Sequence, residues 1–237
     1  MSSFKELISS SIPTEDNVIQ SKESIGPVLF DLSSQKIPES FYQNCMSFYE
    51  KNLTNKFRDI YEGKEVNLNE NKSVSHFEYR KPIEDRNQEY LRHQNEMLEK
   101  SKSLKKDIDG PIVFFGIGGS QLAPSFLHES LMTHLEHEVI FITGSDSDEF
   151  NEKLRGKDLS ECLFIVVSKS FSTIETLDAY KKVTNLNFLE RTYAITASPL
   201  EAKKIGIPEK NILEFNPNTG GRFSVWSPVN FLMPLLL

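Results

Sequence analysis

The stretch CLFIVVSKSFSTIET, residues 162–176, contains the features that decide the fold of this chain. It begins with an apolar run, CLFIVV, which is typical of a strand covered on both faces. A polar loop, SKSFST (168–173), follows directly and leads into a helix-like segment. Five hydroxyl or ammonium side chains in six residues are more polarity than a simple connection needs. Such a loop either caps its own helix or holds an anion.

Short apolar runs of the same kind alternate with helix-like segments throughout the chain after residue 108. The runs are PIVFFGI (111–117), EVIFIT (138–143), CLFIVV (162–167), TYAITA (192–197) and NILEF (211–215). Their spacing leaves room for a crossover helix between most neighbours, which is the pattern of a parallel sheet. We therefore predict an α/β fold of three layers, in which a mostly parallel, five-stranded sheet is flanked by helices.

The chain before residue 108 is charged, rich in asparagine and helical in period. Apolar residues recur at helical spacing from Phe41 to Tyr61, which predicts a helix with one buried face. A second long helix is predicted over residues 84–106, with basic residues near its end, where the helix dipole favours them. We expect residues 1–107 to form an N-terminal helical segment and residues 108–237 to form the α/β domain.

Composition and charge exclude several classes of protein. Of the 237 residues, 38% are hydrophobic and 26% are charged, which is typical of a soluble globular protein. The net charge of −7 argues against a nucleic-acid partner. We see no run long enough to span a membrane and no secretory signal in MSSFKELISS, so we expect a cytoplasmic protein with no membrane partner. His128, His134 and His137 are interpreted as solvated or core-edge residues, so no metal site is expected.

The last residues, SPVNFLMPLLL (227–237), form an apolar run without a charge or a capping residue. Exposed apolar runs are unfavourable, so we expect either a domain cut short or a surface that an absent partner covers. On this interpretation the chain is a fragment of a longer polypeptide.

Three loops that follow strand-like runs carry candidate binding residues. The glycines of GIGGSQLAP (116–124) let the backbone approach a ligand, but Gln121 stands where a dinucleotide fingerprint needs its third glycine. The alternative for this loop is a tight turn with Ser120 as a helix cap. In NTGGRFSVWSP (218–228), two glycines precede Arg222 and could aim its guanidinium into a cleft; the alternative is a surface turn with a solvated arginine.

The loop at 168–173 is the richest of the three in donors. Hydroxyls of Ser168, Ser170 and Thr173 can donate to phosphate oxygens while the following helix start contributes partial positive charge. The alternative is a capping box formed by Ser172 and Glu175. That alternative leaves the other polar residues unexplained, so we favour an anion site.

Taken together, GIGGSQLAP, VVSKSFSTIETL and GGRFSVWS resemble the phosphoglucose isomerase family, whose typical forms are GIGGSxLGP, SKTFTTxET and GGRxSxxS. They occur in the family's order, with about fifty residues between successive motifs. The first two motifs also resemble the broader sugar isomerase (SIS) domain, whereas the third points to the phosphoglucose isomerases themselves. The resemblance covers residues 108–237 well; before it, FEYR (77–80) resembles the family's E-x-R element.

The resemblance implies that residues 108–237 are a first SIS domain that ends before a second one. It also implies interconversion of glucose 6-phosphate and fructose 6-phosphate through an enediolate, without metal or organic cofactor, in a protein that is a homodimer when full length. The implied substrate contacts are Gly119 and Ser120 beside the sugar, Ser168, Lys169, Ser170, Phe171, Ser172 and Thr173 around the phosphate, and Gly221 near the reacting carbons. Arg222 is the implied catalytic residue, which stabilises the enediolate.

Some family features differ or have no counterpart. Ser170 and Ser172 stand where threonines are usual, Gln121 replaces a common aspartate and Ala123 replaces a glycine. The family's proton-shuttling glutamate, ring-opening histidine and C-terminal lysine belong to the second SIS domain and tail, which no motif here resembles. We therefore expect this chain to bind sugar phosphate weakly and not to isomerise it by itself. The rival functions are a non-catalytic SIS module that senses a sugar phosphate, a nucleotide-dependent α/β enzyme and a structural role.

Overall fold

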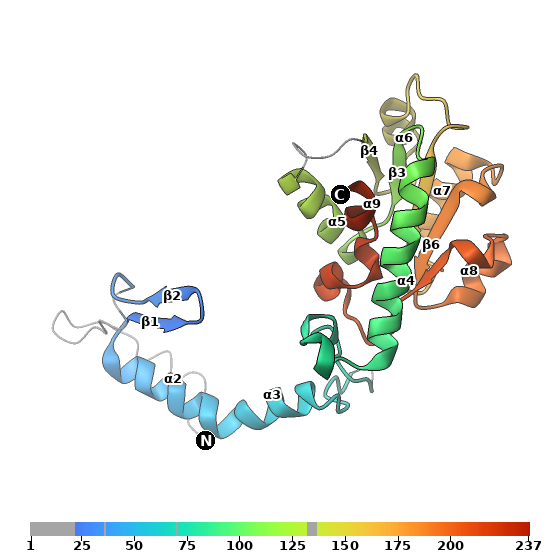
Figure 1. The fold of residues 1–237 in the computed structure, drawn as a ribbon. Helices are drawn as coiled ribbons and strands as arrows, with labels where there is room; N and C mark the ends of the chain where they lie inside the picture. Colours follow the sequence, from blue (N-terminus) through green and yellow to red (C-terminus); the bar gives the residue numbers. More distant parts are fainter. Residues whose placement is uncertain (1–21, 36, 70, 132–136) are drawn as a thin grey trace. The chain divides into compact units, whose positions relative to one another are not determined.

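The computed structural model describes residues 22–35, 37–69, 71–131 and 137–237, and the chain divides into two compact units, Met1–Asn71 and Lys72–Leu237 (Figure 1). The first unit contains an antiparallel hairpin of β1 (Lys22–Ile25) and β2 (Val28–Asp31), which the sequence analysis did not predict. Helices α2 (Glu39–Asn52) and α3 (Thr54–Tyr61) follow.

The helical period predicted from Phe41 to Tyr61 is confirmed, but it belongs to two helices that meet at Leu53. The predicted buried face is wrong, since neither helix has a buried residue. The rings of Tyr49 and Phe57 lie 5.8 Å apart, and both side chains remain exposed.

The second unit contains the sheet and the helices around it. Its strands are β3 (Ile112–Phe115), β4 (Val139–Ile142), β5 (Leu163–Val167), β6 (Thr192–Thr196) and β7 (Ile212–Glu214). Its α-helices are α4 (Gln88–Leu104), α5 (Gly119–Leu131), α6 (Ser147–Lys153), α7 (Ile174–Thr184), α8 (Pro199–Ile205) and α9 (Leu232–Leu236). Its 3-10 turns are η1 (Glu78–Arg80), η2 (Ile83–Asp85), η3 (Lys105–Asp107), η5 (Leu189–Arg191), η6 (Glu209–Asn211), η7 (Gly221–Trp226) and η8 (Pro228–Asn230). Each strand lies within one of the five predicted apolar runs.

The sequence changes texture at residue 108, whereas the compact unit that contains the sheet begins at Lys72. The boundary differs because helix α4 precedes residue 108 but packs against the sheet. At the start of α4 the Asn87 side chain accepts a hydrogen bond from the Glu89 amide at 2.9 Å. Its Met97 and Leu104 belong to the core on one face of the sheet, so this charged helix is part of the α/β unit.

The five strands are paired in the order β4-β3-β5-β6-β7, and every pair is parallel. The chain enters at β3, adds β4 on one side, and then crosses back to place β5 on the other side of β3. The connections therefore diverge between β3 and β5, which makes that point the topological switch of the sheet. In open α/β sheets, ligands bind outside the carboxyl ends of the strands at such a point.

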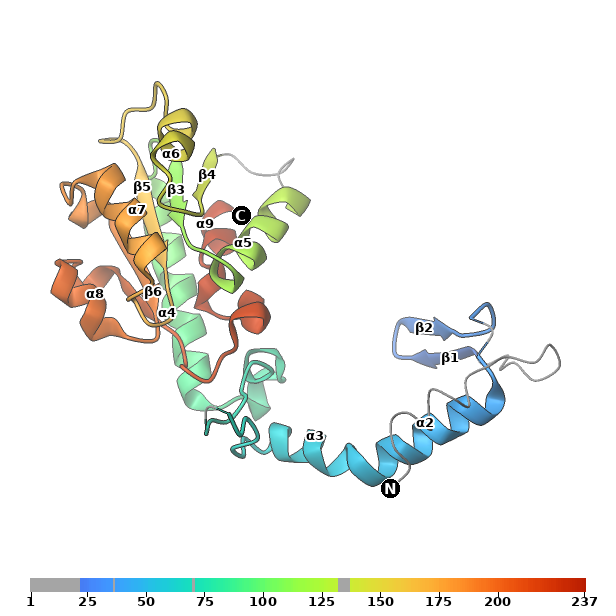
Figure 2. The same cartoon turned by 180° about the vertical axis from the view of Figure 1, so that it is seen from behind.

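Two hydrophobic clusters, one on each face, make the predicted three layers (Figures 1 and 2). Along β3 the side chains alternate: Ile112 and Phe114 belong to the cluster shared with α4 and α9, whereas Val113 and Phe115 belong to the cluster shared with α6, α7 and α8. Both faces of the strand are thus apolar, which explains why its run does not alternate in sequence. The α/β prediction is confirmed.

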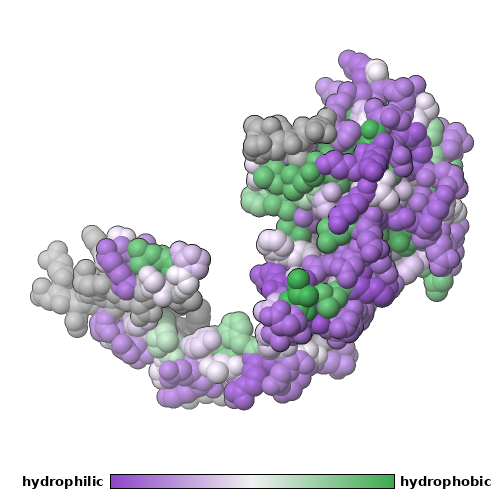
Figure 3. Space-filling view, in the orientation of Figure 1, coloured by the Kyte–Doolittle hydropathy of each residue, from purple (hydrophilic) through white to green (hydrophobic). Residues whose placement is uncertain are grey.

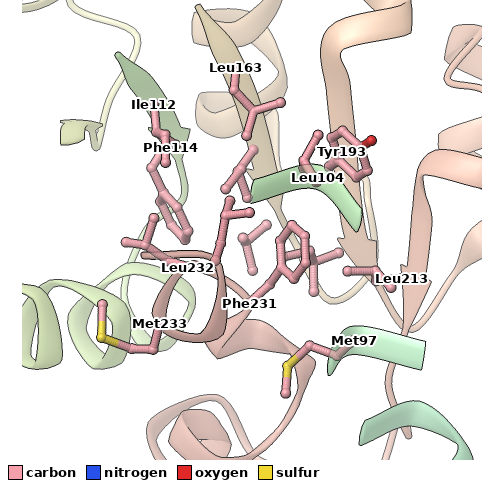
Figure 4. Packing of buried hydrophobic residues seen from close by; sticks show 14 of the residues in the cluster. Met97, Leu104, Ile112, Phe114, Leu163, Tyr193, Leu213, Phe231, Leu232 and Met233 are labelled. Carbon is pink, nitrogen blue, oxygen red and sulfur yellow. The ribbon is translucent and has the colours of Figure 1, made fainter. Parts of the chain in front are cut away.

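The C-terminal apolar run lies inside the first of these clusters (Figure 4). Phe231, Leu232 and Leu235 are fully buried, and the ring of Phe231 stacks on that of Tyr193 with the centroids 5.9 Å apart. The expectation that this run is uncovered is wrong, because α9 packs against the sheet beside α4. Pro228 occupies the first position of η8, where its missing N–H costs nothing.

Part of the exposed apolar surface of this unit lies over α5, where Figure 3 shows a green area. Leu122 and Phe126 are 63% and 65% exposed there. Among the helices that the structure describes, none combines the length and the hydropathy needed to cross a membrane.

Candidate functional site

The loops after β3 and β5 border the switch point of the sheet. Helix α5 follows β3 and places Leu127 and Leu131 against the cluster shared with α4, whereas α7 follows β5 and packs into the opposite cluster. The two loops therefore leave the sheet edge toward opposite faces, which is the position where open α/β sheets bind their ligands. The predicted motifs GIGGS and SKSFST both lie at this edge.

The loop at 168–173 is held by its backbone and by one buried ring. The Ser168 amide donates to the Ile195 carbonyl at 3.2 Å, and the Ala197 amide donates to the Lys169 carbonyl at 3.0 Å. Phe171 adopts a left-handed φ of 49° while its ring, 2% exposed, sits in the cluster with α7. A left-handed backbone at a bulky residue costs about 1–3 kcal/mol, which burial of the ring offsets. Only the backbone of Phe171 therefore faces the loop, while Ser170 and Ser172 are exposed.

The hydroxyls of this loop bond to one another. Ser168 Oγ and Thr173 Oγ1 lie 2.9 Å apart, and Ser172 Oγ donates to Ser170 Oγ at 2.8 Å. The capping box of Ser172 and Glu175 is wrong, since the N-cap of α7 is Thr173 and makes no side-chain cap bond. Thr173 thus does not accept from the first-turn amides of α7, which lie beside hydroxyls that can turn outward. An anion would satisfy both sets of donors.

The loop after β7 runs back across the sheet edge and meets the other two motifs. Lys169 Nζ donates to the Thr219 carbonyl at 3.4 Å. Further along, a Cβ placed on Gly119 would lie 2.3 Å from the Gly221 carbonyl carbon, so these two glycines are in backbone contact. Ser224 Oγ lies 2.6 Å from the Gly221 oxygen and 3.3 Å from the Gly119 oxygen, and its proton bridges the two segments. The three motifs, far apart in the sequence, are therefore in contact with one another at this edge of the sheet.

Gly119 and Ser120 lie in the first turn of α5, so the alternative in which Ser120 caps this helix is wrong. Arg222 lies in η7 and is exposed, with its guanidinium carbon 5.1 Å from the ring centroid of Phe223. It forms no salt bridge among the residues that the structure places. The charge of Arg222 is therefore available to an anionic ligand. The alternative, a surface turn with a solvated arginine, involves no such ligand.

Asn216 and Tyr79 are buried polar residues that bond to each other at the start of the loop after β7, and the sequence analysis did not identify this pair. The Asn216 amide donates to the Tyr79 hydroxyl at 3.4 Å, and Asn216 Nδ2 donates to Glu89 at 2.9 Å. Asn216 Oδ1 accepts from the Asn218 amide at 2.8 Å, which forms a local turn toward Gly221. Burial raises the pKa of Tyr79, so its hydroxyl stays protonated. Tyr79 lies in the motif FEYR and Asn218 opens the third motif, whereas Asn216 and Glu89 lie in none of the motifs quoted above.

His93, on α4, is 1% exposed, and its Nδ1 lies 3.5 Å from the hydroxyl oxygen of Tyr79. Burial, with a smaller effect from Arg92, lowers the pKa of His93 below its ordinary value. Because the unfolded chain then binds a proton more readily than the folded one, the free energy of unfolding falls as pH drops below about 6.5. Burial likewise lowers the pKa of His76 and His128, so they contribute in the same direction.

We expect urea unfolding to show that the free energy of unfolding decreases from pH 8 to pH 5.5. In His93→Gln we expect this decrease to be smaller. A parallel pH dependence in wild type and His93→Gln would contradict the assignment to His93. His128→Gln is the matched comparison, because it removes a histidine with a lowered pKa that is only half-buried.

No group of three or more histidine, cysteine, aspartate or glutamate residues could hold a metal ion in the part of the chain that the structure covers. His134 lies outside the described residues.

A sequence model of the family described as phosphoglucose isomerase matches residues 31–237. The chain belongs to this family. Similar curated phosphoglucose isomerase relatives, each named glucose-6-phosphate isomerase, include one from Blochmanniella floridana that is 29% identical over 89% of this chain and 44% of its own length. Another, from Borreliella burgdorferi (strain ZS7), is 30% identical over 87% of this chain and 45% of its own length.

The fold is also that of a solved member of the family. A crystal structure of a glucose-6-phosphate isomerase from Chlamydia trachomatis superposes with a TM-score of 0.79 at 21% identity, over 98% of this chain and 51% of that one. The chain thus spans less than half the length of these curated relatives and about half of the solved structure.

Proposed function

We propose that this chain is the phosphate-binding portion of a glucose-6-phosphate isomerase, with the sugar phosphate bound at the sheet edge between β3 and β5. The observation that carries the proposal is the meeting of the three motifs: Gly119 contacts Gly221, and Lys169 bonds to Thr219. The alternatives that treat each loop as an isolated turn give no reason for that convergence.

In this proposal the 6-phosphate lies in the loop at 168–173. Ser168, Ser170 and Thr173 donate their hydroxyl protons to it, and Ser172 stands beside Ser170 as a further donor. Lys169 contributes its charge from the same loop. The amides at the start of α7, which the Thr173 side chain does not cap, add a favourable dipole. Hydrogen bonds to a charged group are about twice as strong as those between neutral groups, so a handful of donors suffices in an acidic protein.

The sugar lies beside Gly119 and Ser120 at the start of α5, where the missing side chain of Gly119 lets the Gly221 backbone come close. Gly221 and Arg222 face its reacting carbons. When a proton leaves the carbon next to the carbonyl, negative charge develops on the enediolate oxygens, and the Arg222 guanidinium stabilises it. The reaction interconverts glucose 6-phosphate and fructose 6-phosphate, in a cytoplasmic protein that is a homodimer when full length. Residues 108–237 are the first SIS domain in this scheme, and residues 1–107 are the helical segment that precedes it.

The test is a titration of this chain with fructose 6-phosphate or 6-phosphogluconate, followed through backbone amide resonances. We expect saturable shifts confined to residues 168–173, Gly119–Ser120 and Gly221–Arg222. Ser170→Ala removes one exposed donor to a charged group and is expected to weaken binding roughly tenfold or more. Ser103→Ala is the matched control, because Ser103 is exposed on α4 and donates only to the Lys100 carbonyl.

The proposed site would be contradicted if the folded chain showed no shifts on titration. It would also be contradicted if fructose, which has no phosphate, produced the same shifts as fructose 6-phosphate. Equal binding by wild type and Ser170→Ala would remove this residue from it. We expect no isomerase turnover from the 237 residues alone, and measurable turnover would overturn that expectation. Binding by the complete natural protein without turnover would favour a sugar-phosphate sensor instead.

A further inference from the structure

The segment at 75–79 lies against the loop that carries Arg222. The Ser75 amide donates to the Asn218 carbonyl at 3.3 Å, and the Tyr79 hydroxyl accepts from the Asn216 amide at 3.4 Å. Between these two hydrogen bonds, the segment places the ring of His76 against Phe223, the residue that follows Arg222. Since both hydrogen bonds hold the backbone of the loop, the position of His76 relative to Arg222 is defined by the fold.

His76 forms part of a column of rings that ends at Arg222. Its imidazole stacks on Phe223 with the centroids 4.3 Å apart and the planes at 20°, and the Arg222 guanidinium carbon lies 5.1 Å from the centroid of the same Phe223 ring. His76 also meets its neighbour Phe77 edge-on, with the ring centroids 5.7 Å apart. Phe223 is 43% exposed, and the stacked imidazole covers one face of its ring.

The contact depends on the flat face of the imidazole. Nδ1 of His76 is buried and has no hydrogen-bond partner among the described residues. Burial and the nearby charge of Arg80 lower the pKa of His76, so the ring is neutral near pH 7 and does not repel the guanidinium that shares Phe223 with it. A neutral aromatic platform is what a stacked arginine requires.

We propose that His76 is a positioning residue for Arg222: by stacking on Phe223, it fixes the ring on which the guanidinium rests. An unsupported arginine side chain samples many rotamers, and ordering it before a ligand arrives removes that cost from binding. The consequence for sugar-phosphate binding rests on the proposed function, whereas the positioning of Arg222 does not.

The test compares His76→Leu, which keeps an apolar side chain but has no flat ring, with His76→Phe, which keeps the stack. The reporter is the Nε–Hε resonance of Arg222, assigned by its disappearance in Arg222→Lys. In wild type we expect this resonance to be shifted by the ring and to show restricted motion. His76→Leu is expected to move it toward the free-arginine position with greater mobility, and His76→Phe is expected to restore the wild-type values. Phe223→Leu shows the shift that complete loss of the platform produces.

Backbone amides of β3 and β5 report in each variant whether the sheet has folded. An Arg222 resonance unchanged in a folded His76→Leu would overturn the proposal. A His76→Phe variant that fails to restore it would overturn the stacking mechanism, and this variant decides the matter if His76→Leu does not fold.

Binding gives a separate readout. If wild type binds fructose 6-phosphate, His76→Leu is expected to bind roughly twofold to tenfold more weakly, as loss of one aromatic pair implies, with affinity rescued in His76→Phe. Equal affinity in wild type and His76→Leu would contradict the effect on binding. If wild type does not bind, the proposed function fails while the resonance of Arg222 still decides the role of His76.

Discussion

Gly119→Ala is expected to separate the first motif from the third. The added Cβ would lie 2.3 Å from the Gly221 carbonyl carbon and 2.8 Å from the Arg222 amide nitrogen, and both contacts are with backbone that cannot rotate away. Alanine favours a helix over glycine by about 1 kcal/mol, but the steric cost of overpacking, roughly 1–3 kcal/mol and at the upper end here, outweighs that gain. We therefore expect a lower free energy of unfolding, measured by urea denaturation.

The same substitution bears on the proposed function. Because the Gly221–Arg222 segment must move by a large fraction of an ångström, sugar-phosphate affinity in the titration described above is expected to fall by roughly a hundredfold. Gly144→Ala is the matched control at the same sheet edge. Its Cβ would meet only Glu149 Oε2 at 3.7 Å, so its stability is expected to change by no more than about 0.5 kcal/mol. Equal stabilities for the two variants would show that Gly119 and Gly221 are not in contact.

Leu235→Ala is expected to destabilise the sheet unit by about 2–5 kcal/mol. Leu235 is fully buried in the cluster between the sheet, α4 and α9, and removing its branched end leaves a cavity that the surrounding strands cannot fill. Since single domains are stable by about 5–15 kcal/mol in total, this change removes a large part of the stability. Thermal or urea unfolding measures it directly.

Leu237→Ala, two residues later, is the control. Leu237 is 63% exposed, so the same chemical change is expected to alter the free energy of unfolding by no more than about 0.5 kcal/mol. Similar losses in both variants, or none in either, would contradict the packing of α9 against the sheet.

The strands and the polar loops could be predicted because their signals are local. Five apolar runs of the right length, each followed by glycines or hydroxyls or by a helix start, predict both a parallel sheet and the edge at which its loops collect. The pairing order was not predictable in this way, because neighbouring runs such as those of β3 and β4 carry no mark of which side of the sheet the next strand joins.

Other features depend on partners far along the chain, and there local reasoning failed. SPVNFLMPLLL reads as an exposed end until α4 and the sheet are placed around it. Ser172 and Glu175 have capping-box spacing, yet the Ser172 hydroxyl bonds to Ser170 instead. His76 and Asn216 carry no motif of their own, and their importance comes only from Phe223 and Tyr79, which lie well over a hundred residues away in each case.

The sequence by itself thus determined the α/β architecture, the family and the three loops that carry the candidate site, because these follow from period, spacing and residue type. Only the tertiary structure decided that Gly119 touches Gly221, that Lys169 holds the third loop, and that His76 underlies Arg222 through Phe223. The physical reason is that these contacts join segments that are far apart in the sequence and that meet only once the chain has folded.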